Sequence, residues 1–411
     1  MIQFVLPSWY PHRCHPLHGT FTLEQATAIG ELHPDWKLGV SRWAQGEGRL
    51  SLQHFRESPG CLLDAVRFPS GSEREVSGNV VEFLKRAFSW SEGFLGGNRD
   101  GIMAANRDNL RRAIRRFGRV DLLHAHVSYP AGWVAMKLSE ETGIPYVITE
   151  HMGPFPIPVY ARSDGSLWNL IREPLERASA RMAVSEMLCD RIASFGIPRP
   201  TFVPNVVDER RYDPAKREPW DRFTFFTLGG MHAVKGWPDL LHAIRVFLDA
   251  LSGPERGQVA FRLGGYGPRL AEYRRLAVDL GVEPWLTWPG FLEREAARRE
   301  FHRCDCYVLP SLHESFGVPL VECMALGVPT VATRCGGPDR IVTPETGILV
   351  PVGAPRELAA AMLQVFRREG AWDAAAMRER FLSLYSRAAV MRRLDEAFAT
   401  ALGAGARTPS R

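Results

Sequence analysis

Two glutamates eight positions apart are the residues of this chain whose types and spacing most directly suggest chemistry. They are Glu314 and Glu322, and small or apolar residues fill most of the stretch between them. The mostly apolar run 307–309 before them predicts the end of a strand. Pro319 suits the first turn of a helix, where its missing N–H leaves no hydrogen bond unmade. We therefore expect Glu314 in a loop after a strand and Glu322 about one turn inside the next helix, ~7 Å along its axis.

The start of that helix should present backbone N–H groups that have no partner within the helix, and such groups attract anions. Phe316, Gly317 and Val318 would contribute them. One carboxylate before this anion site and a second one beyond it suit a sugar, a diphosphate and a ribose in that order. The segment therefore predicts a nucleotide-sugar site. Two carboxylates also serve as acid and nucleophile in glycosidases, so that alternative stays open at this point.

Short apolar runs alternate with helical patterns in both halves of the chain, which is typical of parallel sheets covered by helices. In the first half, core strands are predicted at 120–126 and 145–149, joined by a helix near 129–142. In the second half, strands are predicted at 222–228, 259–263, 285–288, 306–309 and 330–333. His126 and His151 each end a predicted strand, so the carboxyl edge of a sheet would present both to a cleft.

The segment with the two glutamates resembles the E-x7-E signature of glycosyltransferase family 4, retaining enzymes of the GT-B fold. Other stretches are similar to further motifs of the family and follow in the same order along the chain. They are Pro7-Ser8-Trp9-Tyr10-Pro11, Gly19-Thr20-Phe21, Val147-Ile148-Thr149-Glu150-His151, Pro204-Asn205-Val206-Val207-Asp208, Lys235-Gly236 and Gly265-Tyr266-Gly267-Pro268. The resemblance implies an α/β protein of GT-B architecture, with two doubly wound Rossmann-like domains facing one another across a cleft.

The resemblance also implies roles for single residues. Glu314 would bind hydroxyl groups of the donor sugar, and Glu322 would bind the ribose hydroxyls. Lys235 would hold the leaving diphosphate, since a fixed cation stabilises the charge that builds there. His151 would contact the donor sugar and orient the acceptor, which makes His151, Lys235 and Glu314 the candidate catalytic residues.

Three further positions complete the candidate site. Gly19 lies in the loop after the first strand, where the absence of a side chain lets the backbone approach a phosphate. By the same resemblance, Phe291 would lie near the nucleotide base, and the backbone N–H groups of Phe316, Gly317 and Val318 would face the sugar and diphosphate. His126 could share the cleft on the acceptor side.

One position departs from the family. An arginine usually precedes the phosphate-binding lysine by five residues, and here Gly230 occupies that position. Four other cations could take its place, and the sequence does not choose among them. They are His232, Arg262, Arg269 and Arg334.

The predicted domains follow from these motifs and from the changes in composition. Residues 1–203 form an acceptor-binding Rossmann-like domain, and 204–219 form a proline-bearing interdomain linker. Residues 220–379 form the nucleotide-sugar-binding domain. By resemblance, a helix at 380–402 returns to the N-terminal domain, and 403–411 form a frayed tail.

Composition sets the broad class. The 411 residues are 45% hydrophobic and 24% charged, which is ordinary for a globular protein, and the formal charge is +5. Seven cysteines without a CxxC pair predict reduced thiols packed as small apolar groups. No apolar run approaches the ~20 residues that span a bilayer. We therefore expect a cytoplasmic protein.

Two additional features suggest other partners. Six arginines between 107 and 119 fall in one predicted helix, and the segment 82–97 carries several large apolar residues, so both could dock on an anionic membrane. No aromatic residues interleave with the arginines, which argues against nucleic acid. His12, Cys14, His15 and His18 could hold zinc, but their spacing matches no known zinc motif, and we expect no metal.

Taken together, the sequence predicts a retaining glycosyltransferase that moves a sugar from a nucleotide-sugar donor to a glycan or lipid-linked acceptor. Such an enzyme needs no bound metal or other cofactor and could act in surface polysaccharide or glycolipid synthesis, at the inner face of the membrane. A non-catalytic GT-B protein that binds sugar nucleotides, and a GT-B sugar-nucleotide epimerase, are the alternatives from other classes.

Overall fold

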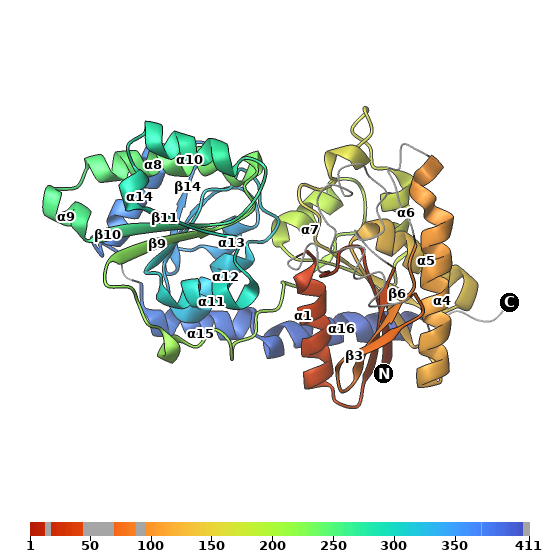
Figure 1. Ribbon diagram of the computed structural model, residues 1–411. Coiled ribbons are helices and arrows are strands. Elements are labelled where there is room, and N and C mark those ends of the chain that lie inside the picture. Colours follow the sequence, from red (N-terminus) through yellow and green to blue (C-terminus); the bar gives the residue numbers. More distant parts are fainter. Residues whose placement is uncertain (13–17, 44–69, 88–94, 371, 406–411) are drawn as a thin grey trace. The chain divides into compact units, whose positions relative to one another are not determined.

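The protein is described by a computed structural model that covers residues 1–12, 18–43, 70–87, 95–370 and 372–405. The chain forms two compact units, each an α/β assembly with its own sheet (Figure 1). Unit 1 comprises Met1–Val184, Leu188–Val206 and the described residues from Val390 onward. Unit 2 comprises Ser185–Met187 and Val207–Ala389.

The sheet of unit 1 has eight strands in the order β3-β4-β2-β1-β5-β6-β7-β8. They are β1 (Ile2–Pro7), β2 (Lys37–Arg42), β3 (Glu73–Ser77), β4 (Val80–Leu84), β5 (Leu122–His126), β6 (Tyr146–Glu150), β7 (Ala180–Ala183) and β8 (Thr201–Phe202). All neighbours run parallel except β3 and β4. The first strand pairs with both β2 and β5, so the strand order reverses beside β1.

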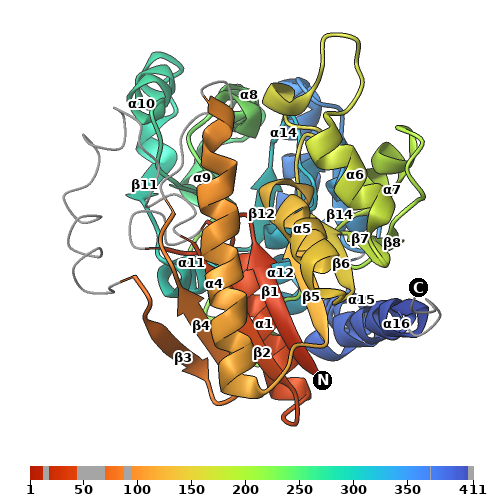
Figure 2. The same cartoon turned by 90° about the vertical axis from the view of Figure 1, so that its right-hand side faces the viewer.

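Helices cover both faces of this sheet because successive side chains of a strand point to opposite sides. The helices are α1 (Thr20–Leu32), α4 (Arg99–Phe117), α5 (Trp133–Thr142), α6 (Asn169–Arg177), α7 (Glu186–Ala193) and α16 (Arg387–Gly405), with the short turns η1 (Leu95–Asn98), η2 (Ser128–Gly132) and η3 (Pro158–Tyr160). Phe4 packs next to Ala113 of α4, whereas Val5 packs in one cluster with Ile29 of α1 and Leu394 of α16. Figure 2 looks onto α4 and α5 in front of the strands.

The sheet of unit 2 has six parallel strands in the order β11-β10-β9-β12-β13-β14. They are β9 (Phe223–Leu228), β10 (Val259–Gly264), β11 (Leu286–Gly290), β12 (Cys306–Leu309), β13 (Thr330–Thr333) and β14 (Gly347–Val350). Within the unit this is the order third, second, first, fourth, fifth, sixth of a doubly wound sheet, with the reversal between β9 and β12. The strand positions predicted from sequence are confirmed within a few residues.

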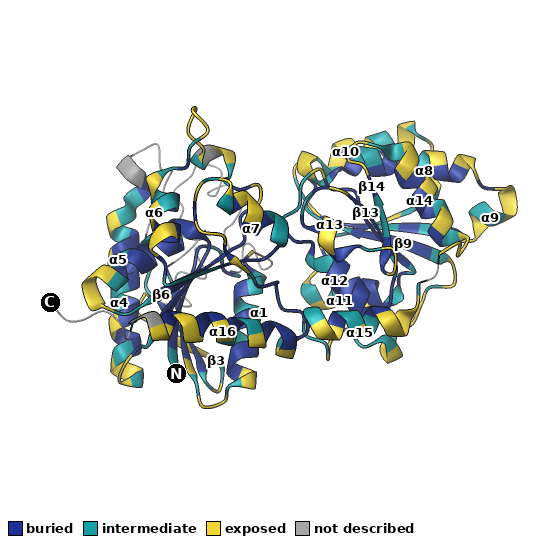
Figure 3. Ribbon diagram, turned by 180° about the vertical axis from the view of Figure 1, so that it is seen from behind, coloured by how far each residue is buried: buried dark blue, intermediate teal, exposed yellow. Residues whose placement is uncertain are grey.

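The helices of unit 2 lie on the two faces of its sheet, with α8, α10 and α14 on one side and α11 and α12 on the other (Figure 1). They are α8 (Trp237–Asp249), α9 (Gly253–Gly257), α10 (Leu270–Asp279), α11 (Arg294–Arg303), α12 (Val318–Leu326), α13 (Pro338–Ile341), α14 (Pro355–Phe366) and α15 (Ala374–Leu384), with the turns η4 (Pro214–Lys216), η5 (Ala233–Lys235) and η6 (Glu283–Trp285). Phe225, Phe247 and Phe261 pack together in the core with Trp237. The central strands of both sheets are buried, whereas the edge strands β3 and β11 are exposed or half-buried (Figure 3).

Several predicted elements differ from the observed ones. The helix predicted near 129–142 begins only at Trp133, because Ser128–Gly132 forms a separate wide turn. The helix predicted at 380–402 is two helices, α15 and α16, and the Ser386 hydroxyl between them accepts a hydrogen bond from the backbone N–H of Ala389. Phe83 and Leu84, which were candidates for membrane contact, are buried in β4, while Phe88, Trp90 and Phe94 lie outside the described residues.

The cysteine prediction is confirmed for the described part of the chain. Cys189, Cys304, Cys306, Cys323 and Cys335 are free thiols, and all are buried. Among the helices of the described residues, none combines the length and apolar content needed to cross a bilayer.

Candidate functional site

The reversal of strand order in unit 2 brings two predicted site residues together. Lys235 follows β9, Glu314 follows β12, and these two strands are direct neighbours in the sheet. The Lys235 Nζ lies 2.6 Å from the Glu314 Oε2 and donates a hydrogen bond to it. In doubly wound sheets, ligands bind beyond the carboxyl ends of the strands at such a reversal. The residues predicted to act on a donor therefore occupy the expected place in the fold.

Gly236 explains how the two loops come so close. Its φ of 66° is a left-handed conformation, and a Cβ there would lie 1.9 Å from the carbonyl oxygen of Pro310. The backbone N–H of Leu312 donates to the carbonyl oxygen of Val234 at 2.8 Å. The loop after β9 thus lies directly against the loop after β12, and the side chain of Lys235 is aimed at Glu314.

Glu314 is also held from the side of β13. Its backbone N–H donates to the carbonyl oxygen of Cys335 at 3.1 Å, and its carbonyl oxygen accepts from the N–H of Gly337 at 2.7 Å. A Cβ at Gly337 would lie 2.5 Å from the backbone nitrogen of Phe316, so this close approach requires glycine. Two main-chain hydrogen bonds from the loop after β13 therefore fix the Glu314 backbone.

The start of α12 is the segment predicted to bind an anion. Gly317 precedes the helix with a φ of 98°, and Pro319 occupies its first turn. Within the described residues, no acceptor takes a hydrogen bond from the backbone N–H groups of Phe316, Gly317 and Val318. These donors remain available beside the Lys235–Glu314 pair. The ring of Phe316 turns inward and packs edge-on against Tyr385.

Glu322 lies inside α12 and is only 8% exposed. Its carboxylate accepts a hydrogen bond from the hydroxyl of Tyr212. Burial raises the pKa of Glu322, while the Tyr212 hydrogen bond and the more weakly acting charge of Arg294 oppose that rise. The two glutamates thus differ: Glu314 has a cationic partner, and Glu322 has a neutral hydroxyl.

Phe291 is exposed and lies at the end of β11, next to the exposed Tyr266. The two rings meet edge-to-face with centroids 6.4 Å apart. The loop that carries Tyr266 is joined to the loop after β9, because the N–H of Met231 donates to the Tyr266 carbonyl oxygen at 3.0 Å. A Cβ at Gly265 would lie 2.0 Å from the carbonyl oxygen of Gly229. Two exposed aromatic rings therefore lie at the loops that follow β10 and β11.

The space at Gly230 is partly filled by His232, since a Cβ at Gly230 would lie 2.8 Å from the His232 Cδ2. Arg262 forms two hydrogen bonds with Glu300, at 2.6 and 2.7 Å, and Arg269 forms two with Glu272. Of the four cations considered as replacements for the missing arginine, these two already have partners. The side chains of His232 and Arg334 are exposed.

In unit 1, His126 ends β5 and His151 follows β6, and the two side chains meet. The His126 Nδ1 lies 3.0 Å from the His151 Nε2, and the ring of Phe21 stacks on His151 at a centroid distance of 4.0 Å. His126 is only 1% exposed. His151 is buried as well, at 7% exposure, so the two imidazoles form a buried contact at the carboxyl ends of β5 and β6.

Three histidines of unit 1 that lie side by side, His124, His126 and His151, are neutral at physiological pH. Burial lowers the pKa of His124 and of His151 to about 3, and the pKa of His126 is also far below its usual value. Beside them, the buried carboxylate of Glu150 accepts three backbone hydrogen bonds, from Ser128, His151 and Met152. An uncharged imidazole at position 151 can donate or accept a hydrogen bond but carries no charge near neutral pH.

Gly19 is required by contacts within unit 1. Its φ is 68°, and a Cβ would lie 2.2 Å from the carbonyl oxygen of Trp9. The expectation that this glycine lets the backbone approach a phosphate has a second explanation, because the turn before α1 already excludes any side chain.

Three residues near the site were missed from the sequence. Tyr212 lies in the segment predicted as a polar linker, and its aromatic character was the available signal. Glu150 directly precedes His151, and Phe21 belongs to a motif that was recognised only for its glycine. Among the described residues, no group of three or more His, Cys, Asp or Glu could hold a metal ion, while Cys14 and His15 lie outside them.

Comparison with known proteins shows the family of the chain. Residues 222–368 match the family model described as "Glycosyl transferases group 1", and residues 72–211 match the one described as "Glycosyltransferase Family 4". The "Uncharacterized glycosyltransferase YqgM" of Bacillus subtilis is 27% identical over 273 residues, which cover 66% of this chain and 74% of that protein.

Two solved structures share the fold. Sucrose-phosphate synthase from Thermosynechococcus elongatus has a TM-score of 0.72 at 18% identity, with 98% of this chain and 99% of that chain covered. Anabaena HepE in complex with UDP and glucose has a TM-score of 0.66 at 17% identity, with 97% and 99% covered. The two family matches and the shared fold define a glycosyltransferase of the GT-B type. The chain belongs to glycosyltransferase family 4.

Proposed function

We propose that the protein is a retaining glycosyltransferase that moves a hexose-type sugar from a nucleotide sugar to a hydroxyl of a glycan or lipid-linked acceptor. The observation that carries the proposal is the group formed by Lys235, Glu314 and the free N–H groups at the start of α12, with Glu322 about one turn further. A diphosphate needs cations and N–H donors, and the sugar on one side and the ribose on the other need hydroxyl acceptors.

The proposed reaction proceeds on one face of the sugar. The bond between the anomeric carbon and the diphosphate oxygen breaks, and its electron pair stays on the diphosphate. Lys235 and the N–H groups of α12 stabilise that charge. The acceptor oxygen bonds to the anomeric carbon from the leaving-group side, and its proton passes to the diphosphate oxygen. Configuration is then retained without a protein nucleophile, and no bound metal is needed.

The donor class has one further support. HepE, with the same fold, binds UDP and glucose, so UDP-glucose is the first donor to test. His151 of unit 1 would orient the acceptor as a neutral hydrogen-bonding group. A role in surface polysaccharide or glycolipid synthesis at the inner face of the membrane belongs to the same proposal, and the exposed Arg111 and Arg115 on α4 would supply the lipid contact.

A non-catalytic sugar-nucleotide-binding protein is the second candidate, and Gly230 favours it. The arginine that usually accompanies the phosphate-binding lysine in this family is absent at that position, although the exposed His232 lies beside it. Binding of a donor without turnover on any acceptor would support this candidate over the enzyme.

A thermal-shift screen of UDP-, GDP- and ADP-sugars tests the proposal, because a ligand that binds the folded state raises its Tm. One donor class should raise the Tm of wild type and leave the Glu322→Ala variant unshifted. Glu283→Ala, at an exposed glutamate of the same unit, should respond as wild type does. If no donor shifts wild type, or if Glu322→Ala responds equally, the donor site is wrong. NMR of the product's anomeric proton then tests retention.

A further inference from the structure

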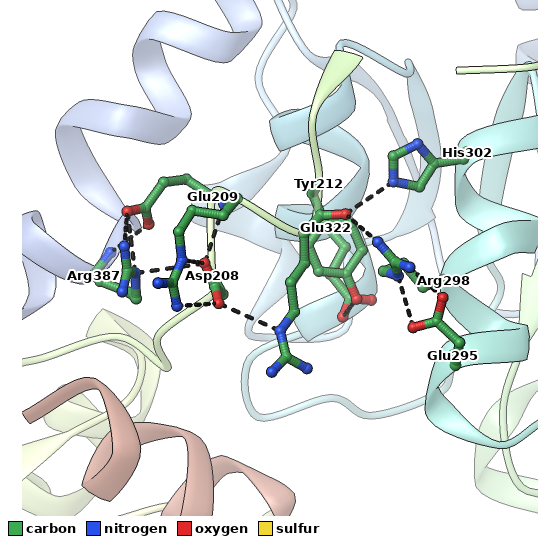
Figure 4. A network of polar contacts seen from close by, with 10 residues as sticks. Asp208, Glu209, Tyr212, Glu295, Arg298, His302, Glu322 and Arg387 are labelled. Atoms are coloured by element: carbon green, nitrogen blue, oxygen red, sulfur yellow. Dashed lines mark hydrogen bonds and ion pairs between the residues drawn. The ribbon is translucent and has the colours of Figure 1, made fainter. Parts of the chain in front are cut away.

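We propose that Tyr212 is a positioning residue that holds the Glu322 carboxylate for the two hydroxyl groups of the donor ribose. The inference rests on the proposed function, because it takes Glu322 as the ribose-binding group. Tyr212 lies in the segment that precedes η4 and not in α12, so it reaches Glu322 from a distant part of the sequence (Figure 4).

The carboxylate of Glu322 is incompletely satisfied. Within the described residues, the Tyr212 hydroxyl is its only hydrogen-bond partner, and that bond involves one oxygen, Oε1. A carboxylate has about four acceptor sites. Among the described residues, the other oxygen, Oε2, receives no hydrogen bond, so its acceptor sites are available to donors of a ligand. Two neighbouring hydroxyl groups of a ribose are donors of the required kind and number.

The backbone of Tyr212 is fixed relative to α12 by Arg378 of α15. The Nη1 of Arg378 donates to the carbonyl oxygen of Tyr212 at 2.6 Å and to that of Ala325, in α12, at 2.9 Å. Its Nη2 donates to the carbonyl oxygen of Glu209 at 2.9 Å. One guanidinium thus joins the segment that carries the tyrosine to the helix that carries the glutamate.

The ring of Tyr212 is held as firmly as its backbone. It is only 3% exposed and stacks on the imidazole of His302 at a centroid distance of 6.3 Å and an interplanar angle of 15°. His302 and Arg298 both bind the carbonyl oxygen of Arg211, at 3.0 and 3.2 Å (Figure 4). The phenol therefore has one orientation, and its hydroxyl fixes one orientation of the carboxylate.

A tyrosine suits this role better than a cation. Burial raises the pKa of Tyr212 well above its usual value, and the neighbouring Glu322 adds to the effect, so the phenol remains a proton donor at physiological pH. The hydrogen bond lowers the pKa of Glu322 against the effect of burial without neutralising its charge. Glu322 thus stays an acceptor for ribose hydroxyls, whereas Glu314 is neutralised by Lys235 until a ligand binds.

The test compares ligands with and without the ribose hydroxyls. Affinities of UDP, GDP and ADP and of their 2′,3′-dideoxy forms are measured by calorimetry. The nucleotide that binds wild type most tightly is then used, in both forms, for the comparison with the variants. Wild type should prefer the ribose form by about 10- to 100-fold. Tyr212→Phe keeps the stacked ring and should lose about 10-fold for the ribose form and little for the dideoxy form. As the pH is lowered, nucleotide binding should begin to weaken at a higher pH in Tyr212→Phe than in wild type. The reason is that loss of the hydrogen bond raises the pKa of Glu322, so the carboxylate is protonated earlier.

Two controls separate positioning from folding. Tyr146→Phe removes a buried hydroxyl that donates to the carbonyl oxygen of Pro174 in unit 1; it should lower the Tm without changing nucleotide affinity. In a Glu322→Gln background, Tyr212→Phe should cause no further loss for the ribose form. Equal loss for both ligand forms, or no loss, overturns the role of Tyr212 and leaves the proposed function standing. If no nucleotide binds wild type, or if wild type binds both forms equally, the donor-site assignment itself fails.

Discussion

At the scale of single residues, Lys235 and Glu314 form an ion pair that is only partly buried, so they contribute little to folding and are free to exchange partners when a donor binds. The expected consequence is a separation of effects. Lys235→Ala should lower kcat by about 100- to 1,000-fold, because it removes the cation that stabilises the leaving diphosphate. Its Tm should stay close to that of wild type. Initial rates with the donor found in the thermal-shift screen measure the first effect, and calorimetry measures the second.

Lys137→Ala is the matched control for that change. Lys137 also pairs with a glutamate, Glu140, at 2.8 Å, but on the surface of unit 1. This variant should keep full activity. An active Lys235→Ala enzyme, or one that loses activity only because it unfolds, would contradict the assigned role.

The buried histidines of unit 1 predict a stability that depends on pH. The pKa of His124 and of His151 is about 3 in the folded state and ~6.5 in the unfolded state, so the unfolded state binds more protons between these values. The neutral histidines therefore make their full contribution to the free energy of unfolding above pH ~6.5, and this contribution falls as the pH drops. Between pH 7 and pH 5 each histidine should remove about 2 kcal/mol from the free energy of unfolding.

Urea unfolding of unit 1 at the two pH values measures this loss. His151→Asn removes one of the titrating groups and should lose about 2 kcal/mol less than wild type over the same interval. A wild-type stability that is unchanged between pH 7 and pH 5 would show that these imidazoles are not held neutral by burial.

The sequence identified several site residues one by one but not the contacts between them. Glu314 and Glu322 were predicted from their spacing within one strand, loop and helix, which is local information. The pairing of Lys235 with Glu314 spans 79 positions and depends on β9 and β12 being neighbours. Tyr212 was missed for the same reason, since its partner lies in another element and no local pattern connects them.

At the scale of elements, α4 shows how a correct helix prediction can leave the partners of its charged residues undetermined. Arg112 is buried and binds Glu73 of β3 at 3.1 Å, and Arg116 binds Glu73 and Glu75. Arg107 binds Glu141, and Arg119, beyond the helix, binds Asp121. Four of the six arginines thus have acidic partners. Sequence periodicity could not reveal this, because Glu73 and Glu75 belong to an edge strand, β3, that lies far from α4 in the sequence.

The remaining cations of α4 set the expected strength of membrane binding. Arg111 and Arg115 lie one turn apart and are both exposed. Each should contribute about 1 kcal/mol near an anionic surface. Vesicles with phosphatidylserine should therefore co-sediment weakly with the protein, less so as the salt concentration rises. The double variant Arg111→Glu and Arg115→Glu should bind phosphatidylserine vesicles no better than phosphatidylcholine vesicles. If wild type binds both kinds of vesicle equally, α4 does not make the proposed contact.

At the scale of the whole molecule, the strand order of each unit reverses beside its first strand, and some predicted residues end or follow the strands at that point: His126 in unit 1, and Lys235 and Glu314 in unit 2. That much follows from alternating strands and helices, because parallel sheets of this kind have few alternative topologies. The end of the chain is different. A strand–helix pattern does not reveal that α16 begins in unit 2 and packs from Val390 onward in the core of unit 1; only the family resemblance suggested it.

The packing of α16 makes a prediction that distinguishes the units. Phe398 is 1% exposed and contacts His124 and Trp36 of unit 1. Phe398→Ala should cost about 3–5 kcal/mol and lower the Tm of unit 1 by about 10 °C. Leu402→Ala, at a 37% exposed position of the same helix, should change the Tm of unit 1 only slightly. In scanning calorimetry, the transition that a nucleotide shifts should keep its midpoint in Phe398→Ala, because the donor site belongs to unit 2. A loss of nucleotide binding in this variant, or equal destabilisation by the two substitutions, would show that α16 does not stabilise unit 1 in this way.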